Sequence, residues 1–402
     1  MSDLRQPRPK TLPRPRTAAA LALLALLAAC TTVERPPEKK PVPETAFTAV
    51  SWEETGDADA RGWSEALSAF RRSCRTIAAN PAWAAPCRAA DAADPAAAQT
   101  FFRTAFTPWR VEAPAGDALT DTGLMTGYYE PLLKGSRVKT GRFAHPIYGV
   151  PDDLLVIDLG EQHPELKGLR LRGRLEGRRV VPYDRRSAIQ ERGDMARWAI
   201  AWADDPVDVF FLQIQGSGRV ELPDGSFMRV GYADQNGWKY RSISGWLVQH
   251  EGLKPSELSM QRIRAWAKAH PEKVKEALAQ NPSFIFFEER SGDPALGPVG
   301  AQGVALTPGA SVAVDPKRWR LGTPFIVATE QDRPALSFTR PVVAQDTGGA
   351  IKGVLRFDYF WGFGDEAGSA AGRQKSRVKA WVLVPAGLTP EDVIPAGARK
   401  VK

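Results

Sequence analysis

From Leu306 onward, short apolar segments alternate with turns rich in glycine and proline, and this feature constrains the fold most. The segments are SVAVD, TPFIVA, RPVVAQD, KGVLRFDYFWG and VKAWVLV. Runs of this length and spacing are typical of strands that close over one core. The sequence therefore predicts a compact all-β barrel near the carboxyl end.

The apolar period changes twice upstream of this barrel. From Trp63 to about Arg110 it is helical and predicts two or three packing helices. The helical pattern returns between residues 255 and 281, where Pro271 opens a second short helix, and SFIFFEE at 283–289 predicts a strand.

The middle of the chain alternates between apolar and polar residues. In residues 209–215, Phe210, Leu212 and Ile214 fall on one face, and Gln213 and Gln215 fall on the other. This alternation predicts a half-buried strand, and the turn residues that follow extend the interpretation to a β-meander over 208–233.

The amino terminus has the pattern of an export signal. Five basic residues precede the apolar stretch at 18–29. This stretch is too short for a transmembrane helix, which needs about 20 apolar residues to cross the hydrocarbon core. The segment LLAAC resembles the lipobox of bacterial lipoproteins, with Cys30 as the lipidated residue; ordinary signal-peptidase cleavage is the alternative. The absence of Asp after Cys30 resembles outer-membrane sorting in Gram-negative cells. We expect a signal peptide at 1–29 and a lipidated tether at 30–46.

The composition narrows the chemistry. Three Cys and four scattered His are too few for a metal cage, so we expect neither a metal nor another cofactor. Five basic residues and one acidic residue lie in 1–29, so the net charge of +8 falls to +4 without that segment. No nucleic-acid motif accompanies this charge. Cys74 and Cys87 are the remaining thiols and should form a disulfide in an oxidising compartment, with two free thiols as the alternative.

Carboxylates are the remaining candidates for catalysis. Asp315, Asp346 and Asp358 each end or interrupt an apolar run, where an Asp is costly unless it is paired or hydrogen-bonded. Apolar surroundings raise a carboxyl pKa, as a general acid near neutral pH requires. Asp358, followed by Tyr359, Phe360 and Trp361, is the most suggestive, although capping or a turn is the more common role of a lone Asp in a strand.

Ten segments in order between about 110 and 385 resemble the membrane-bound lytic murein transglycosylase A family. They are TGYYEP, QIQGSG, NGWKYRSIS, SMQRIRAW, NPSFIFF, SVAVDP, LGTP, DTGGAIKG, FDYFWGFGDEAG and VKAWVLV. The resemblance implies a mainly β fold with flanking helices: a double-psi β-barrel with a second β-barrel domain inserted, and a substrate groove between them. It places the first part of the double-psi barrel domain and the helices at 47–142, the insert at 143–290, and the rest of the barrel with its three-aspartate module at 291–402.

The resemblance also assigns roles. Asp358 matches the catalytic acid, Asp346 resembles a partner that orients or tunes it, and Asp315 is the supporting third aspartate. Weaker matches that line the groove are Tyr128, Tyr129, Gln213, Gln215, Ser217, Lys239, Tyr240, Arg241 and Trp361. For these residues packing, a turn or a solvated surface is the alternative.

The implied activity is cleavage of peptidoglycan glycan strands between N-acetylmuramic acid and N-acetylglucosamine without water, which leaves 1,6-anhydromuramyl ends. Two other classes stay open: a hydrolytic glycosidase on the same barrel, with Asp346 as its second carboxylate, and a non-catalytic murein-binding lipoprotein. The expected location is the periplasmic face of the outer membrane, held by the lipid anchor. Peptidoglycan synthases or divisome proteins are conceivable partners.

Overall fold

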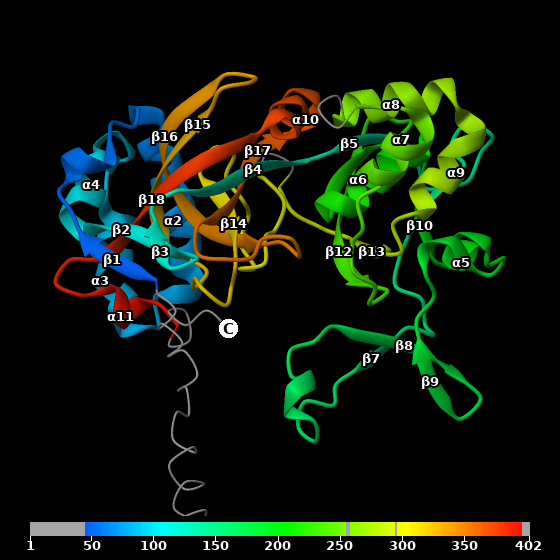
Figure 1. The fold of residues 1–402 in the computed structure, drawn as a ribbon, viewed down its shortest axis with the longest axis horizontal. Coiled ribbons are helices and arrows are strands. Elements are labelled where there is room, and N and C mark those ends of the chain that lie inside the picture. The colour runs from blue at the N-terminus through cyan, green and yellow to red at the C-terminus, as the bar shows by residue number, and fades with distance from the viewer. Residues whose placement is uncertain (1–44, 255–257, 294–295, 396–402) are drawn as a thin grey trace, which may run out of the picture. The chain divides into compact units, whose positions relative to one another are not determined.

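The structure, a computed structural model, describes residues 45–254, 258–293 and 296–395. Six strands from both ends of this range close into a barrel in the order β18, β15, β16, β14, β17, β4 and back to β18 (Figure 1). Their bounds are β4 (Gly123–Glu130), β14 (Ser311–Val314), β15 (Pro324–Gln331), β16 (Leu336–Thr347), β17 (Arg356–Phe363) and β18 (Lys375–Pro385). The predicted carboxyl-terminal barrel is confirmed, and β4 completes it.

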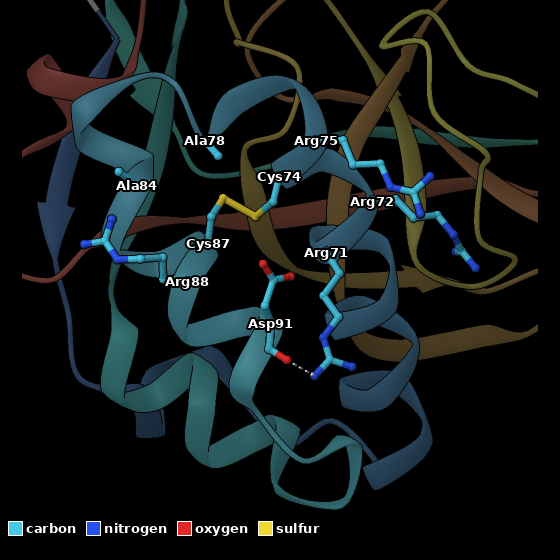
Figure 2. A pocket seen from close by; sticks show the side chains of 9 residues that line it. All are labelled: Arg71, Arg72, Cys74, Arg75, Ala78, Ala84, Cys87, Arg88 and Asp91. Carbon is cyan, nitrogen blue, oxygen red and sulfur yellow. Dashed lines mark hydrogen bonds between the residues drawn. A yellow bond between two sulfur atoms is a disulfide. The ribbon is translucent and has the colours of Figure 1, made fainter.

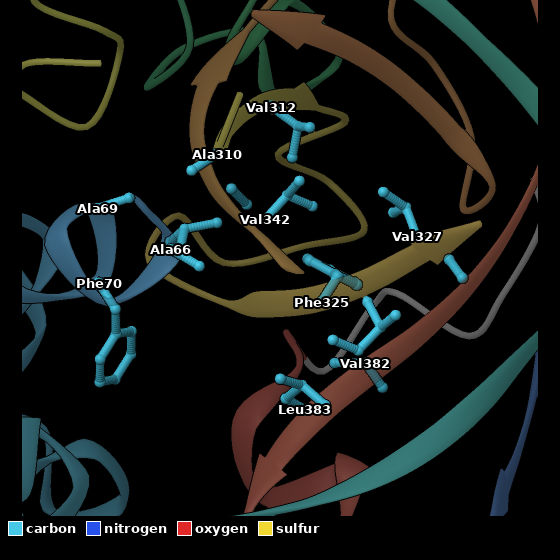
Figure 3. Packing of buried hydrophobic residues seen from close by; sticks show 14 of the residues in the cluster. Ala66, Ala69, Phe70, Ala310, Val312, Phe325, Val327, Val342, Val382 and Leu383 are labelled. Atoms are coloured by element: carbon cyan, nitrogen blue, oxygen red, sulfur yellow. The ribbon is translucent and has the colours of Figure 1, made fainter. Parts of the chain in front are cut away.

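The barrel core is made by the apolar runs that predicted the strands. Val312, Phe325 and Val382 are fully buried and belong to one cluster that also includes residues of the amino-terminal helices. Figure 3 shows Ala66 and Ala69 of α2 (Ala60–Ile77) next to Val342 of β16. The small side chains on this face of α2 let the helix approach the barrel closely.

Within the described residues, three helices precede the barrel strands in the chain, as the helical spacing predicted: α2, α3 (Pro81–Ala92) and α4 (Ala98–Ala105). Asp59 and Asn80 cap the first two by accepting hydrogen bonds from backbone N–H groups. The disulfide between Cys74 and Cys87 is confirmed and links α2 to α3.

The predicted helical region does not reach Arg110. Strand β2 (Phe106–Ala115) begins at Phe106 and pairs with β18, and β1 (Ala46–Ala49) and β3 (Ala118–Thr120) pair with β2. Phe106 is buried in this strand, and a buried position at Phe106 also fits helical spacing, so the spacing alone extended the predicted helix too far.

A second sheet domain lies between β4 and β14 in the chain. Its six strands run in the order β13, β12, β11, β5, β10, β6. They are β5 (Leu132–Ser136), β6 (His145–Tyr148), β10 (Ala199–Ala203), β11 (Ser217–Glu221), β12 (Phe227–Gln235) and β13 (Ile285–Glu289). Because β5 already pairs here, this sheet starts earlier in the chain than the boundary at 143 drawn from the sequence. Strands β7 (Leu155–Ile157), β8 (Leu171–Glu176) and β9 (Arg179–Pro182) form a separate small sheet.

The predicted strand at 209–215 is wrong, because this segment is the helix α6 (Pro206–Gln215). Asp205 caps its start by accepting from the N–H of Val207, Pro206 occupies the first turn, and Gly216 ends it with φ of 80°. In a short apolar run, the spacing of the apolar residues alone does not distinguish a helix from a strand. The cap, the proline and the glycine were the missed signals, whereas the rest of the predicted meander is present as β11 and β12.

The predicted helix pair is confirmed as α8 (Met260–Ala269) and α9 (Pro271–Ala279), and the predicted strand that follows is β13. The remaining helices are α5 (Arg186–Glu191), α7 (Ser244–Glu251), α10 (Gly364–Arg373) and α11 (Pro390–Val393). Short 3-10 turns are η1 (Trp52–Thr55), η2 (Pro95–Ala97), η3 (Pro164–Leu166) and η4 (Met195–Trp198).

The expected signal peptide, Cys30 and most of the tether lie outside the described residues. Across the ranges that are described, no helix combines the length and apolar character needed to cross a membrane.

Candidate active site

Strand β14 brings two of the three aspartates to the same level of the barrel. It lies between β16 and β17, and its Ala313 is the register partner of both Asp346 and Asp358. Residues at one register position point to the same face of a sheet, and strands two positions apart are separated by about 10 Å. The two carboxyl groups therefore face the same side of the sheet, from the strands on either side of β14.

Strand β4 supplies the groups that contact these carboxyls. Thr126 is the register partner of Asp358, and its hydroxyl donates a 2.5 Å hydrogen bond to Asp358 Oδ1. Two residues further on, the hydroxyl of Tyr128 donates to Asp346 Oδ2 at 3.1 Å. Residues i and i+2 of a strand share a face. One face of β4 thus holds both aspartates.

Arg356 completes the surroundings of Asp358. Its guanidinium donates to Thr126 Oγ1 at 2.9 Å and also to the carbonyl of Phe357. The Thr126 hydroxyl accepts the hydrogen bond from Arg356 and donates its own to Asp358, so it is oriented from one side and donates on the other.

Burial raises the pKa of Asp358 to about 6. The hydrogen bond from Thr126 and the positive charge of Arg356 act against this shift, and the charge of Asp346 adds to it. The protein packed around Asp358 removes much of its hydration, which raises the pKa. The residue nevertheless keeps some accessible surface. A carboxyl with this pKa can hold a proton in mildly acidic to nearly neutral solution and release it.

Asp346 is held differently. Its Oδ1 accepts two backbone N–H groups, from Ala301 and Thr347, both at 2.9 Å, and its Oδ2 accepts from Tyr128. Burial raises its pKa, and the three hydrogen bonds counter that rise by stabilising the carboxylate. Most of the acceptor positions of Asp346 are occupied by protein donors.

Asp315 ties two loops together. It is buried just after β14, where Oδ1 accepts from the N–H of Lys317 and Oδ2 accepts from the N–H of Gly353 at 2.9 Å. Gly353 has φ of 112°, a conformation that favours glycine. The arrangement is that of a structural carboxylate.

Three other residues predicted for the groove lie in packed surroundings. Tyr129 is buried, and its hydroxyl contacts Met260 Sδ at 2.9 Å. Gln213 is buried on α6 and accepts a hydrogen bond from Arg186. Trp361 packs against Tyr359 and donates to Gln374. For these three, the geometry supports the packing alternative.

The remaining predicted groove residues belong to the second sheet domain. Gln215 ends α6 and accepts from the N–H of Tyr129, and Ser217, half-buried, begins β11. Lys239, Tyr240 and Arg241 are exposed in the loop between β12 and α7. Within the described residues, no hydrogen bond or ion pair joins any of these five side chains to the three aspartates.

The structure also contains a cavity that the aspartates do not line. That cavity, of about 460 Å³, lies between α2 and α3 beside the disulfide and is lined by four arginines, Asp91 and small side chains (Figure 2). None of the three aspartates or their partners lines it. In the part of the chain that the structure covers, no group of three or more His, Cys, Asp or Glu side chains is arranged to hold a metal ion.

Three residues of the site were not predicted: Thr126, Arg356 and Ala301. Thr126 begins the segment TGYYEP and Arg356 precedes the segment FDYFWG, so both were near recognised motifs. Their roles depend on a parallel pairing of strands more than 200 residues apart. No local pattern reports such a pairing.

Comparison with known proteins gives matching assignments for both parts of the chain. Residues 124–288 match the model of the MltA specific insert domain, and residues 310–384 match the 3D domain. Membrane-bound lytic murein transglycosylase A of Escherichia coli strain K12 is 34% identical over 265 residues, which span 64% of this chain and 64% of that relative.

Solved structures extend the similarity over nearly the whole fold. The crystal structure of MltA from Neisseria gonorrhoeae is 34% identical, with a TM-score of 0.74, over 89% of this chain and 98% of that one. The structure of E. coli MltA with bound chitohexaose is 28% identical, with a TM-score of 0.64, over 85% of this chain and 94% of that one. The fold class implied by the resemblance is thereby confirmed. The chain belongs to the family of membrane-bound lytic murein transglycosylase A.

Proposed function

We propose that this protein is a lytic transglycosylase that cleaves the bond between N-acetylmuramic acid and N-acetylglucosamine in peptidoglycan. The observation that carries the proposal is Asp358: one carboxyl whose pKa is raised by burial to about 6, on the barrel strand of a family of lytic murein transglycosylases. The family supplies the reaction class, and the geometry supplies a group able to perform both proton transfers.

In this mechanism protonated Asp358 donates its proton to the glycosidic oxygen as the bond from C1 of the muramyl residue to that oxygen breaks. The electron pair stays on the leaving oxygen. The resulting carboxylate then accepts the proton of the muramyl C6 hydroxyl, whose oxygen bonds to C1. The product is a 1,6-anhydromuramyl end, and no water is consumed. Attack from within the same sugar lets proximity contribute to the rate.

The state of Asp346 favours this mechanism over hydrolysis. A hydrolytic glycosidase needs a second carboxylate that acts as nucleophile or holds a water. Three protein donors already occupy Asp346, and its Oδ1 accepts two of them. We assign Asp346 to positioning Tyr128 and the Ala301 loop and to raising the pKa of Asp358 by its charge.

Glycan binding is proposed for the faces of the barrel and the second sheet domain that flank Asp358, which together would form the substrate groove. The chitohexaose in the E. coli relative supports a polysaccharide ligand of this type. Within this proposal, Tyr128, Gln215, Ser217 and the exposed loop residues Lys239, Tyr240 and Arg241 are the remaining candidates for substrate contact.

Membrane association is proposed from the family name together with the lipobox-like segment before Cys30. The finer proposal is a lipid anchor on Cys30 at the periplasmic face of the outer membrane. Replacing Cys30 by Ala should release active protein from membranes into the soluble fraction; membrane-bound protein after this change would contradict the lipid anchor.

The proposal is tested with Asp358→Asn, which keeps the shape of the side chain and removes the transferable proton. General acid catalysis contributes about 10²–10⁴ in rate, and this group also serves as the base, so release of anhydromuropeptides from purified sacculi should fall by at least about 10³. Retention on insoluble murein should persist. Asp332→Asn, on an exposed turn of the same barrel, is the matched control and should keep full activity. More than about a tenth of the activity in Asp358→Asn would contradict the assignment and make Asp346 the candidate.

A further inference from the structure

A buried charge cluster lies where the chain passes between the barrel and the second sheet domain. Glu130, the last residue of β4, is almost fully buried and accepts a 2.9 Å hydrogen bond from Nε of Arg219 on β11. Arg229, the register partner of Arg219 on β12, places Nη2 3.9 Å from the other carboxylate oxygen. We call these three residues the Glu130 clamp.

The same two arginines hold the segment by which the chain returns to the barrel. Nη2 of Arg219 donates to the carbonyl of Leu296 at 2.9 Å. Arg229 donates to the carbonyls of Asp293 and Gly297, at 2.9 and 2.6 Å. On the outgoing side, the backbone N–H of Arg219 donates to the carbonyl of Pro131 at 2.8 Å. Both connections between the two sheets are thus fixed to one hairpin of the second sheet domain.

The clamp also contacts the strand that carries the proposed acid. The guanidinium of Arg219 lies 4.3 Å from the ring centroid of Phe363, near the end of β17, and Phe363 is the register partner of Glu130. Glu130 is four residues beyond Thr126 and two beyond Tyr128, so all three side chains lie on one face of β4. The groups that hold Asp358 and Asp346 and the carboxylate that holds the second sheet therefore share one strand face.

We propose that the Glu130 clamp is a positioning device that fixes the second sheet domain relative to Asp358, so that a glycan strand bound by both parts presents its bond to the acid. This inference rests on the proposed function and deepens it. A buried carboxylate shared by two arginines is directional and costly to break, unlike an exposed ion pair. A misplacement of about 1 Å can lower a rate on the order of 10²-fold.

The direct test measures the spread of distances between the two parts. Cysteines for spin labels replace exposed Asp224, on the β11–β12 turn, and exposed Asp332, on the β15–β16 turn, in the full chain with Cys30→Ala. Glu130→Gln should broaden the distance distribution. The matched control is Arg137→Gln, which breaks the exposed Arg137–Glu289 pair within the second sheet domain and should leave the distribution narrow. An unchanged distribution in Glu130→Gln would overturn the proposal.

Kinetics separate positioning from a merely structural role. For Glu130→Gln, kcat/KM on long glycan strands should fall by about 10–10²-fold, through a raised KM together with a lowered kcat, and the loss should shrink on short oligosaccharides that contact the barrel alone. Retention of the uncut strand by Glu130→Gln in an Asp358→Asn background should weaken in parallel. A lower kcat with unchanged KM and equal losses on both substrates would indicate fewer folded molecules and would overturn the proposal.

A second variant, less disruptive than Glu130→Gln, tests the clamp even if Glu130→Gln does not fold. Phe363→Ala removes the ring over Arg219 without leaving a buried charge unpaired, and Phe363 is about half exposed. It should broaden the distances and raise KM less than Glu130→Gln; wild-type values for both would overturn the proposal. The distance measurement does not depend on activity. It therefore tests whether the clamp fixes the second sheet domain, even if the wild-type protein yields no anhydro product and the proposed function fails.

Discussion

At the scale of single residues, two aspartates at one level of the barrel have opposite surroundings. Asp358 accepts a hydrogen bond from Thr126, and burial raises its pKa to about 6, whereas Asp346 accepts three hydrogen bonds that counter the effect of its burial. Similar carboxyls are thus separated into one that can exchange a proton and one that organises its neighbours.

The raised pKa has a consequence for stability. Asp358 ionises near pH 4 in the unfolded chain and near pH 6 in the folded one, so its contribution is fully present below pH 4 and is lost as the pH rises to about 6. Asp358→Asn has no carboxyl to ionise at this position, so its stability does not decrease in this way as the pH rises. Relative to wild type, the variant should gain stability between pH 4 and pH 7, by at most about 3 kcal/mol and by less because the group is partly accessible.

Urea unfolding of both proteins at pH 4 and pH 7 measures this difference. Asp332→Asn, which alters an exposed carboxyl in a turn of the same barrel, should show a much smaller pH-dependent change. If Asp358→Asn is less stable than wild type at pH 7 and no less stable at pH 4, the pKa of Asp358 is not raised by folding.

The pH profile of activity should respond to the charges around the acid in opposite directions. Arg356 lowers the pKa of Asp358, so Arg356→Gln should move the alkaline limb of kcat to higher pH. Asp346 raises it, so Asp346→Asn should move that limb to lower pH. Rates on soluble glycan between pH 4 and pH 9 check both. Shifts in the same direction would show that another group controls the limb.

At the scale of elements, the sequence patterns located strands and helices well where the period was long or the caps were clear. The helices α8 and α9 followed from their spacing and from Pro271, and the carboxyl-terminal strands followed from their Gly and Pro turns. The segment at 209–215 failed because seven apolar-rich residues fit both periods, and tertiary burial of both faces hid the helical pattern.

The disulfide links two elements and should stabilise the chain by constraining its unfolded state. Cys74 and Cys87 are separated by 13 residues. A loop of this length corresponds to about 3 kcal/mol in the chain-entropy treatment. The double variant Cys74→Ala/Cys87→Ala should lose about that much in guanidinium unfolding, with kcat and KM of the folded protein unchanged. Treating the wild type with a reductant is the matched control, and a midpoint unaffected by both changes would refute a stabilising role.

At the scale of the whole molecule, the proposed function depends on contacts between distant parts of the chain. Asp358 was assigned from resemblance because an Asp in a strand has many roles, but Thr126 and Glu130 could not be assigned from any pattern near them. Their roles arise from pairing β4 with β17 and from packing β4 against the β11–β12 hairpin. The spacing of apolar residues indicates which face of a helix or strand is buried. It carries no information on which other element packs against that face.

The central claim is that one carboxyl cleaves the glycan without water, and product analysis in heavy-oxygen water tests it most directly. Sacculi digested by the wild-type protein in this solvent should release muropeptides that end in 1,6-anhydromuramic acid, lighter by one water than reducing ends and free of the heavy isotope. Asp358→Asn should release almost none. Reducing ends that carry heavy oxygen from the solvent would contradict the account, because they would show that water, and not the C6 hydroxyl, attacks C1.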